Sequence, residues 1–439
     1  MKALNSTLPS TIIRCMLPLA GMKTVSCFPW RVRIAALAFL VAWFAGLGGA
    51  HAQLPGTQLP NGLTCQKVPP DGHVTSNPIT CTVSCTQGGK LASALTLAPR
   101  TTAGLTITIN GTCVEAVDQV PGNATLQGAS SGDGLQAPAA SSNPVLGISG
   151  AGVVLDNLTI SGGAIALWVH SGASAVGTNL EIEGSSIRNV FANGVLTLNS
   201  STIENSNADG IDAFSGGIVF LNGGTVRNNT RGVSVGSGSY LDALGGAIIS
   251  DNTGGHGALV NGSLVVVAAT IEGNSPDGVH PFNGGTALIA GGGVVRSNAR
   301  DGVRVAGGSV EVDGAVSNNA GNGITILNSG TAIIDDGGVV MSNEGNGVLV
   351  EDGTVQVGSG GVTGGAAGII QSNGANGIYL KTNSVGYFND PGNQIVSNSG
   401  WGILCDGTPA NPLIAIGLAG KIGTVSGNGT GQISCNIAP

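Results

Sequence analysis

The stretch Val295–Val303 reads VRSNARDGV, and close copies of it recur along the chain. Each copy contains an aliphatic residue, two small or polar residues, Asn, three variable residues, Gly, and then Val or Ile. The other clean copies are Ile271–Val279, Val316–Ile324, Val340–Val348, Ile370–Ile378 and Ile395–Ile403. Starting from Gly278, their glycines follow one another after 24, 21, 24, 30 and 25 residues. Such a period, with no helical pattern inside it, predicts a solenoid.

Looser copies of the repeat precede the clean ones. They are Ile187–Val195 (with Gly194 aligned to Gly210), Ile203–Ile211, Val226–Val233 and Ile249–Ala258. After each glycine the residues alternate, as in Val303, Arg304 and Val305, which places the first and third inward and the second outward. Two further short apolar runs lie in each repeat. Three short strands per coil, joined by Gly, Asn and Asp turns, predict an all-β chain that forms a parallel β-helix.

The coils over about residues 100–430 resemble the right-handed parallel β-helix repeats of the pectin-lyase-like superfamily. Ile107–Glu115 (ITINGTCVE) also resembles the opening coil of that superfamily. The resemblance implies a single right-handed parallel β-helix and says little about activity. Because open ends of such a helix expose strand edges, we expect caps at both ends.

The first 52 residues have the pattern of an export signal. Lys23, Arg31 and Arg33 precede an apolar run, and Ala50-His51-Ala52 is an A-x-A cleavage site, so Met22 is the expected start and cleavage is expected after Ala52. A retained membrane anchor is the alternative, although the run is short for a spanning helix. The predicted parts are a leader at 1–52, a cap rich in Cys and Pro at 53–104, repeats at 105–404 and a C-terminal cap at 405–439.

The charge balance limits the partners. The chain has 16 Lys and Arg against 24 Asp and Glu, and the leader contains five of the cations and no anion. The mature chain therefore has 16 − 5 = 11 cations and a net charge of 11 − 24 = −13. Nucleic-acid binding needs clustered cations and is excluded. Unaided binding of a polyanionic glycan is disfavoured unless a metal ion bridges the charges.

Six cysteines remain after the leader, and an even number in an exported chain predicts disulfides. Cys65 with Cys81 and Cys85 with Cys113 are the favoured pairs before the repeats. Cys405 and Cys435 follow the repeats and lie 30 residues apart, close to one coil. We expect them to form the third bridge. The localisation is predicted to be periplasmic, secreted or cell-surface, and the chain is expected to be a monomer without stable membrane insertion.

One repeat position holds Asn throughout. Its members are Asn252, Asn274, Asn298, Asn319, Asn343, Asn373, Asn398 and Asn428. A sugar-binding surface is one interpretation. The favoured interpretation is structural, because Asn tolerates left-handed turns and stacked amides can bond from coil to coil. The recurring glycine is likewise interpreted as a backbone-dihedral requirement.

Chemistry is expected at two variable positions, the residue before the glycine and the second residue after it. Between residues 209 and 304 these positions become ionisable, with Asp209, Asp212, Arg231, His256, Asp277, His280, Asp301 and Arg304. Neighbouring coils are about 4.8 Å apart, so Asp277 would lie beside His256 and Asp301. Two close carboxylates raise one pKa, as an acid–base pair needs. Asp277 and Asp301 are also candidate Ca²⁺ ligands, and no other cofactor is expected.

Three interpretations of this patch remain open: catalysis, binding without catalysis, and plain turn surface, because Asp and Asn favour turns anyway. Asn207–Asp212 (NADGID) and Gly255-His256-Gly257 resemble polygalacturonase motifs. The paired aspartates expected between them are replaced by Arg231-Gly232, and no Arg-Ile-Lys follows His256. The Arg-x-Pro-x-x-Arg element of pectate lyases is absent, although Arg300 or Arg304 could serve as a base-like Arg near Asp277 and Asp301.

A second patch is aromatic, with Tyr379, Tyr387, Phe388 and Trp401 on the last coils. Such rings suit a sugar platform or a cover over the open core, and both remain open. The function predicted from the sequence is an exported protein that binds, and in one version cleaves as a lyase or glycoside hydrolase, an extracellular polysaccharide. Arg231, Tyr379 and Trp401 are the predicted substrate-binding residues. The alternative is a non-catalytic surface or structural protein of the adhesin type.

Overall fold

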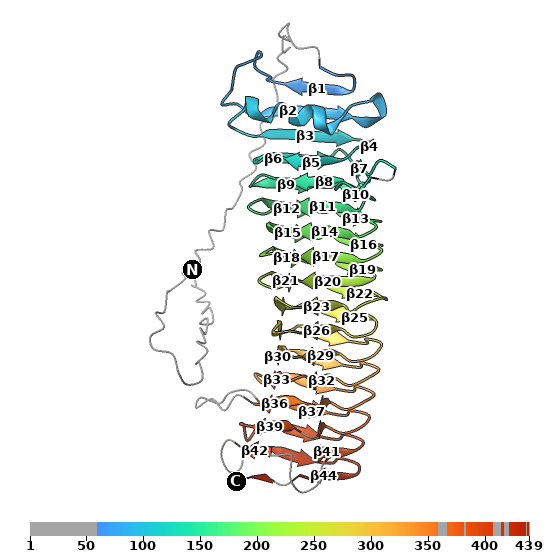
Figure 1. The fold of residues 1–439 in the computed structure, drawn as a ribbon, viewed down its shortest axis with the longest axis vertical. Coiled ribbons are helices and arrows are strands. Elements are labelled where there is room, and N and C mark those ends of the chain that lie inside the picture. The colour runs from blue at the N-terminus through green and yellow to red at the C-terminus, as the bar shows by residue number, and fades with distance from the viewer. Residues whose placement is uncertain are drawn as a thin grey trace, which may run out of the picture. The chain divides into compact units, whose positions relative to one another are not determined.

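The computed structural model describes residues 59–139, 141–358, 367–381, 383–406, 414–416, 421–435 and 437–438. They belong to one compact unit, Gly56–Pro439. The predicted leader, 1–52, lies outside the described residues. The unit is a right-handed parallel β-helix with three strands per coil (Figure 1), so the predicted fold is confirmed.

Sheet I contains 17 strands and runs the full length of the coil stack. They are β1 (Leu63–Gln66), β2 (Ile79–Ser84), β3 (Leu105–Asn110), β6 (Ala124–Gly128), β9 (Val153–Asp156), β12 (Ser174–Thr178), β15 (Val195–Asn199), β18 (Ile218–Asn222), β21 (Tyr240–Leu244), β24 (Ser263–Val266), β27 (Thr286–Ile289), β30 (Ser309–Val312), β33 (Gly330–Ile334), β36 (Gly353–Val357), β39 (Ser384–Phe388), β42 (Ile414–Ile416) and β45 (Ile437–Ala438). Only the β1–β2 pair is antiparallel among the described strands.

Sheet II contains 14 short strands. They are β4 (Thr112–Val114), β7 (Gly134–Gln136), β10 (Thr159–Ser161), β13 (Glu181–Glu183), β16 (Thr202–Glu204), β19 (Thr225–Arg227), β22 (Ile248–Ser250), β25 (Thr270–Glu272), β28 (Val294–Arg296), β31 (Ala315–Ser317), β34 (Val339–Met341), β37 (Ile369–Gln371), β40 (Gln394–Val396) and β43 (Thr424–Ser426).

Sheet III also contains 14 strands and carries the candidate site. They are β5 (Val117–Val120), β8 (Leu146–Ile148), β11 (Ile165–Val169), β14 (Arg188–Ala192), β17 (Asp209–Ala213), β20 (Arg231–Val235), β23 (Ala258–Val260), β26 (Val279–Pro281), β29 (Val303–Ala306), β32 (Ile324–Leu327), β35 (Val348–Val350), β38 (Ile378–Leu380), β41 (Trp401–Cys405) and β44 (Gly431–Ile433). Strand pairing therefore continues past both predicted boundaries of the repeat region, 105 and 404.

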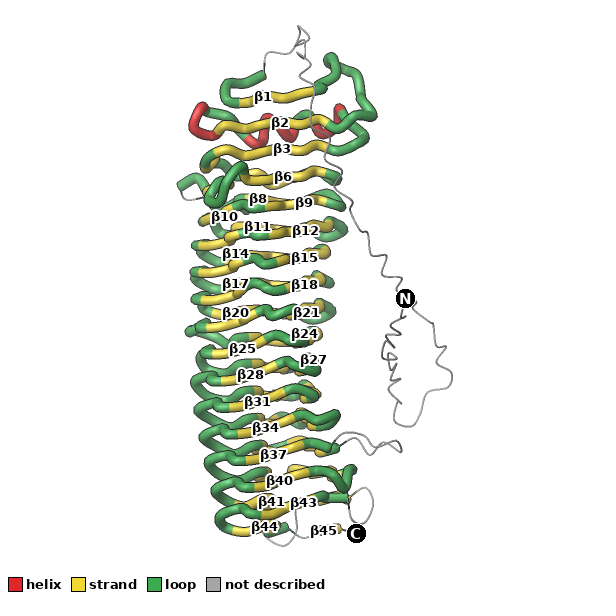
Figure 2. The backbone as a smooth tube through the Cα atoms, turned by 180° about the vertical axis from the view of Figure 1, so that it is seen from behind, coloured by secondary structure: helices red, strands yellow, loops and turns green. Residues whose placement is uncertain are grey.

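The strands of the three sheets follow one another around each coil (Figure 2). The core between the sheets consists mainly of aliphatic side chains. The alternation predicted after each glycine is present, because Val303 and Val305 are fully buried and Arg304 between them is half-buried. β-branched residues suit this arrangement, since they pack well on a pleated surface. The outward residues are therefore free to vary from coil to coil without disturbing the core.

The predicted asparagine ladder is present at the turn between sheets II and III. Asn274 Nδ2 donates to Asn298 Oδ1 at 3.2 Å, and Asn298 Nδ2 donates to Asn319 Oδ1 at 2.9 Å. The same contact continues through Asn343, Asn373, Asn398 and Asn428 and begins earlier than predicted, at Asn229. These amides are buried, and their bonds to backbone satisfy polar groups that would otherwise be unpaired.

The conformational reasons predicted for the ladder and the glycine are wrong. The left-handed residue is the one that precedes each ladder Asn, such as Asp251, Ser297 (φ 54°) and Asn318 (φ 55°). The recurring glycine is not left-handed either: a Cβ on Gly278 would lie 2.6 Å from Asn298 Nδ2 and from Val295 Cγ1. The ladder amide and the next coil therefore fill the space in which a side chain would stand, and the glycine is required for room.

One of the looser repeat copies is out of register. Arg188, and not Asn193, pairs with Asp209, because Asn189 stands where later coils have the glycine. Gly194 lies just before β15 of sheet I, and Leu196 is a core residue. The variable positions of this coil are consequently Arg188 and Phe191.

Disulfides lie near both ends of the coil stack. Cys65–Cys81, Cys85–Cys113 and Cys405–Cys435 are all bonded, as predicted. The short helices η1 (Cys85–Gln87), α1 (Leu91–Leu95) and η2 (Ala98–Arg100) lie between β2 and β3 in the chain. Helix α1 buries its leucines in the core, and Glu115 accepts hydrogen bonds from its first backbone N–H groups. Among the described residues, no helix is long and apolar enough to span a membrane.

Candidate functional site

The candidate site lies on the outer face of sheet III, where two rows of side chains follow the stack. We call the residues before the recurring glycine the pre-glycine row: Arg188, Asp209, Arg231, His256, Asp277, Asp301, Asn322, Asn346, Asn376 and Trp401. We call the outward residues of the strands the strand row: Trp168, Phe191, Asp212, Ser234, Leu259, His280, Arg304, Thr325, Leu349, Tyr379 and Leu404. Neighbours in each row come from successive coils.

The C-terminal half of the pre-glycine row forms a second ladder. Asn322 Oδ1 accepts the backbone N–H of Asn346 at 2.8 Å, and the same contact joins Asn346 to Asn376 and Asn376 to Trp401. Asp301 Oδ1 accepts the N–H of Asn322 at 3.0 Å, and Asp277 Oδ1 accepts the N–H of Asp301 at 3.2 Å. One oxygen of each aspartate is therefore engaged in the same backbone contact as the amides.

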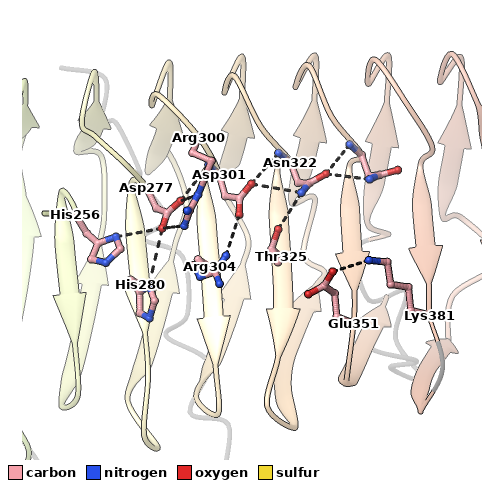
Figure 3. Close-up of polar contacts among 11 residues, drawn as sticks. His256, Asp277, His280, Arg300, Asp301, Arg304, Asn322, Thr325, Glu351 and Lys381 are labelled. Atoms are coloured by element: carbon pink, nitrogen blue, oxygen red, sulfur yellow. Dashed lines mark hydrogen bonds and ion pairs between the residues drawn. The ribbon is translucent and has the colours of Figure 1, made fainter. Parts of the chain in front are cut away.

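The second oxygen of Asp277 is the centre of a cluster of polar side chains (Figure 3). Asp277 Oδ2 lies 3.2 Å from His256 Nδ1, 3.9 Å from His280 Nδ1 and 2.8 Å from Arg300 Nη2. Arg300 Nε also donates to Asp277 Oδ1 at 2.9 Å, which makes the ion pair bidentate. The carboxylate is fully buried, whereas its three partners reach the surface.

The environment of Asp277 favours its ionised form. Burial by itself would raise the pKa of this carboxyl, but polar contacts from His256 and His280 and the charge of Arg300 outweigh burial and hold the pKa well below its usual range. The two imidazole rings are 4.4 Å apart between centroids. Asp277 is therefore held as an anion that faces two histidines.

The pKa of Asp301, on the next coil, is raised. Burial raises its pKa, the hydrogen bonds from Asn322 and Thr325 lower it, and the nearby Asp277 raises it further. Arg304 Nη1 lies 3.8 Å from Asp301 Oδ2. The two neighbouring carboxyls are therefore shifted in opposite directions: burial is the largest cause of the raised pKa of Asp301, whereas the contacts with His256, His280 and Arg300 lower the pKa of Asp277.

A second ionic group lies toward the N-terminal end of the same rows. Arg231 Nε lies 2.9 Å from Asp209 Oδ1, and Arg188 Nε donates to Asp212 Oδ2 at 2.6 Å. Burial raises the pKa of Asp209 to about 6, Arg231 lowers it, and Asp212 adds to the rise. Burial also raises the pKa of Asp212 against the effect of Arg188. The candidate residues thus form two clusters in continuous rows.

Three aromatic side chains extend the second cluster, and sequence reasoning missed all of them. Trp168 stacks on His170 at 4.1 Å between centroids, and Phe191 lies between Trp168 and Phe214. Asn193 Oδ1 accepts the indole N–H of Trp168 at 2.8 Å and so fixes the ring. Period-two alternation along β11 and β14 was the available signal, but these coils lack the clean Asn and Gly phrase.

The predicted aromatic patch does not form one surface. Tyr379 belongs to the strand row of sheet III, and its hydroxyl donates to Asp406 at 2.7 Å. Trp401 lies on the next coil, in the pre-glycine row. Tyr387 is exposed on sheet I, and Phe388 is a fully buried core residue. Alternation along β39 places these two neighbours on opposite faces, which the patch prediction overlooked.

The sequence prediction placed Arg300 near Asp277 as a candidate base but did not predict their bidentate ion pair. Arg300 precedes the pre-glycine position and reaches back one coil to make that contact. For metal binding, the donor atoms of His256, Asp277 and His280 all lie within 4.8 Å of one another. Two acidic groups, Glu181–Glu183–Glu204 and Glu311–Asp313–Asp335, meet the same distance limit on other sheets. The predicted Ca²⁺ pair, Asp277 and Asp301, stays a prediction.

Comparison with known proteins gives no family. No family model matches the chain, and no curated protein matches it. Among solved structures, the chain is similar to the Dettilon tailspike protein, with 12% identity and a TM-score of 0.37 over 80% of this chain and 68% of that one. It is also similar to the A-module of the mannuronan C-5 epimerase AlgE6 of Azotobacter vinelandii, with 15% identity and a TM-score of 0.29 over 79% of this chain and 95% of that one. The fold assignment therefore depends on the strand pairing of this chain itself.

Proposed function

We propose that this chain is an exported protein that binds an extracellular polysaccharide along the outer face of sheet III. One observation supports the proposal above the others. Aromatic rings and ionisable side chains gather in two adjacent rows of this sheet, on successive coils from Trp168 to Arg304. A row of contacts repeated at about 4.8 Å suits a ligand that itself repeats.

The chemistry of the rows suits sugars. A sugar ring has an apolar face, which can pack on Trp168 and Phe191, and hydroxyl groups, which need polar partners once they leave water. Arg231, Ser234 and His280 supply donors and acceptors farther along the face. Most of the charges are already paired within the protein, so a neutral polysaccharide is the expected class.

The binding test uses the full chain and a panel of neutral and acidic polysaccharides, each measured with Ca²⁺ and with chelator. Trp168→Ala is expected to weaken binding by about 5- to 150-fold, since one aromatic contact contributes on the order of 1–3 kcal/mol. Tyr387→Ala is the matched control, because Tyr387 is exposed on sheet I. Equal losses in both variants, or no glycan bound at all, would reject the proposal and favour the adhesin-like alternative.

Cleavage of the bound glycan is the second candidate, favoured by the contacts of Asp277. A buried carboxylate against Nδ1 fixes an imidazole, and His280 or His256 would then move protons at the surface. Asp277 would be a positioning residue, while Asp301, with its raised pKa, would be the acid.

The cleavage test incubates the same panel with the protein and detects new reducing ends or unsaturated products. If a product forms, His280→Leu should abolish its formation and leave binding measurable, because Leu259 occupies the same row on the preceding coil. Binding without any product would reject cleavage and leave the binding proposal standing.

A further inference from the structure

Two histidines and one aspartate on adjacent coils direct their donor atoms at a common point (Figure 3). His256 Nδ1 lies 3.2 Å and His280 Nδ1 3.9 Å from Asp277 Oδ2. Both Nδ1 atoms are buried and have no aligned hydrogen bond among the described residues. The rings are nevertheless partly exposed, with 19% and 16% of their side-chain surfaces accessible. Two buried nitrogens that face one carboxylate oxygen without proper hydrogen bonds need another explanation.

The spacing fits a shared metal ion. Bonds of about 2.0–2.2 Å in tetrahedral geometry place ligand atoms about 3.4 Å apart. The two Nδ1–Oδ2 distances, 3.2 and 3.9 Å, lie on either side of that value, and all three donors lie within 4.8 Å of one another. Small side-chain adjustments would complete the geometry, since the backbone positions already bring the donors together.

Neighbouring groups bond to the Asp277 carboxylate in the way that outer partners bond to metal ligands. Arg300 and the backbone N–H of Asp301 both donate to Asp277 Oδ1, and Arg300 also contacts Oδ2. These contacts fix the carboxylate plane, and such outer partners orient the inner ligands of metal sites. Oδ2 keeps a lone pair for an ion on the side of the histidines.

The donor set selects the class of ion. Calcium and magnesium prefer oxygen ligands, whereas imidazole nitrogen suits zinc, cobalt and nickel. The charges of Asp277 and Asp301 are balanced by Arg300 and Arg304, which further disfavours an ion held mainly by charge. Three protein ligands leave a fourth position for water or a ligand oxygen.

We propose that His256 Nδ1, Asp277 Oδ2 and His280 Nδ1 bind one divalent ion of the zinc class, with an open position toward the outer face of sheet III. This metal site does not depend on the glycan proposal. It shares Asp277 with the predicted calcium pair, but two histidines replace Asp301 and the expected ion is different.

The test titrates the full chain, without a polyhistidine tag and after chelator treatment, with Zn²⁺ and with Co²⁺. Calorimetry should give a stoichiometry near one for Zn²⁺, and Co²⁺ should give visible absorption bands of a low-coordinate nitrogen–oxygen site. Ca²⁺ is expected to give neither stoichiometric heat nor competition. Metal content after dialysis provides an independent count.

Three variants probe the ligands, and each replacement already occurs in the same row. His256→Asn and Asp277→Asn copy Asn322 of the pre-glycine row, and His280→Leu copies Leu259 of the strand row. Each is expected to weaken Zn²⁺ binding well beyond the 10–100-fold typical of outer partners. Circular dichroism and thermal melting confirm that each variant is folded.

His170→Gln is the matched control. His170 directly follows β11 of sheet III, and its Nε2 lies 3.6 Å from Asp118 Oδ1, but no second histidine is paired with that carboxylate among the described residues. Its replacement should leave Zn²⁺ affinity unchanged. Absence of saturable Zn²⁺ and Co²⁺ uptake by the unaltered chain, or wild-type affinity in folded ligand variants, would overturn the metal proposal whatever the glycan panel shows.

Discussion

Asp277 has two roles that its two oxygens separate. Oδ1 continues the backbone contact made by the asparagines farther along the pre-glycine row, while Oδ2 faces His256, His280 and Arg300. An asparagine can perform the first role and not the second. The turn interpretation and the functional interpretation of this residue are therefore both compatible with its geometry, and substitution can distinguish them.

Asp277→Asn is expected to be mild and Asp277→Ala severe. Asparagine keeps the acceptor for the Asp301 N–H and loses the charged bonds to Arg300, at a cost of about 1–3 kcal/mol. Alanine also leaves that buried N–H without its acceptor, at a further cost of about 1–3 kcal/mol. Urea unfolding of both variants measures the difference, and equal destabilisation would show that Oδ1 contributes nothing to the fold.

Asp209 is expected to make stability depend on pH. Its pKa is about 6 in the folded chain, against 3.8 ordinarily, chiefly because it is buried. The folded state then binds a proton that the unfolded state has released. The contribution is full below about pH 4 and is lost as pH rises through 6.

The measurement compares wild type with Asp209→Asn from pH 4 to 7.5, because other titrating groups largely cancel in the difference. The variant should gain relative stability with rising pH, by up to about 3 kcal/mol. A difference that stays constant over this range would contradict the raised pKa.

The clean repeat copies determined which single residues could be predicted from the sequence. Asp277, His280 and Asp301 were found because they occupy the variable positions of clean copies. The ion pair of Arg300 with Asp277 was not predicted, because the side chain of Arg300 crosses to the preceding coil and the repeat pattern does not encode side-chain direction. Trp168 was missed because its coil lacks the phrase that marks the positions.

At the scale of the elements, two ladders of side chains run along sheet III: the buried asparagine ladder and the pre-glycine row. They need different hydrogen-bonding groups. The buried ladder of Asn319 and its equivalents needs side chains that donate and accept. The pre-glycine row needs an acceptor for the next backbone N–H, which an aspartate provides as well as an asparagine. This difference explains why aspartates occur in the second row, and it makes a specific prediction for the first.

Asn319→Asp is expected to be strongly destabilising. Asn319 Nδ2 donates to Asn343 Oδ1 at 2.8 Å and to the carbonyl of Val295 at 3.4 Å. A carboxylate there would place an unpaired buried charge against two acceptors, at a cost of about 3–5 kcal/mol. Chemical denaturation measures the loss, which should shrink at low pH as the new carboxyl becomes protonated.

Asn318→Asp is the matched control for that substitution. Asn318 is exposed and left-handed, and Asp251 occupies the equivalent position on an earlier coil. The control should change stability by no more than about 0.5 kcal/mol. Similar losses in the two variants would contradict a structural role of the buried amides.

The strands were predicted correctly, whereas the explanation of why the turns contain Asn and Gly was wrong. Period-two alternation and the Asn–Gly phrase were sufficient for the strands, because inward and outward positions differ in polarity. They were insufficient for Gly278, since the crowding by Asn298 and Val295 exists only once coils are stacked. The register of Ile187–Val195 failed for a similar reason: Asn189 replaces the glycine that marks the position.

At the scale of the whole solenoid, each coil contacts only its neighbours, so stability is close to a sum of local terms. The disulfides lie near the ends of the stack, where an end coil has a neighbour on one side only. The candidate site lies well inside, with paired coils on both sides of β26. Unfolding of the coils at one end of the stack should therefore leave the candidate site intact.

The double variant Cys405→Ser/Cys435→Ser tests this separation. The bridge closes a segment of 30 residues, so its loss removes about 3–4 kcal/mol in a chain-entropy account. In a solenoid this loss is expected to appear as local opening, with faster hydrogen exchange in β41 and β44 and unchanged exchange in β26 and β29. Zn²⁺ and glycan binding at His256 and His280 should persist.

The double variant Cys65→Ser/Cys81→Ser should instead open the other end of the stack, at β1 and β2. Uniformly faster exchange through β26 in either variant would show that the coils unfold as one cooperative unit, and the site would then depend on both ends.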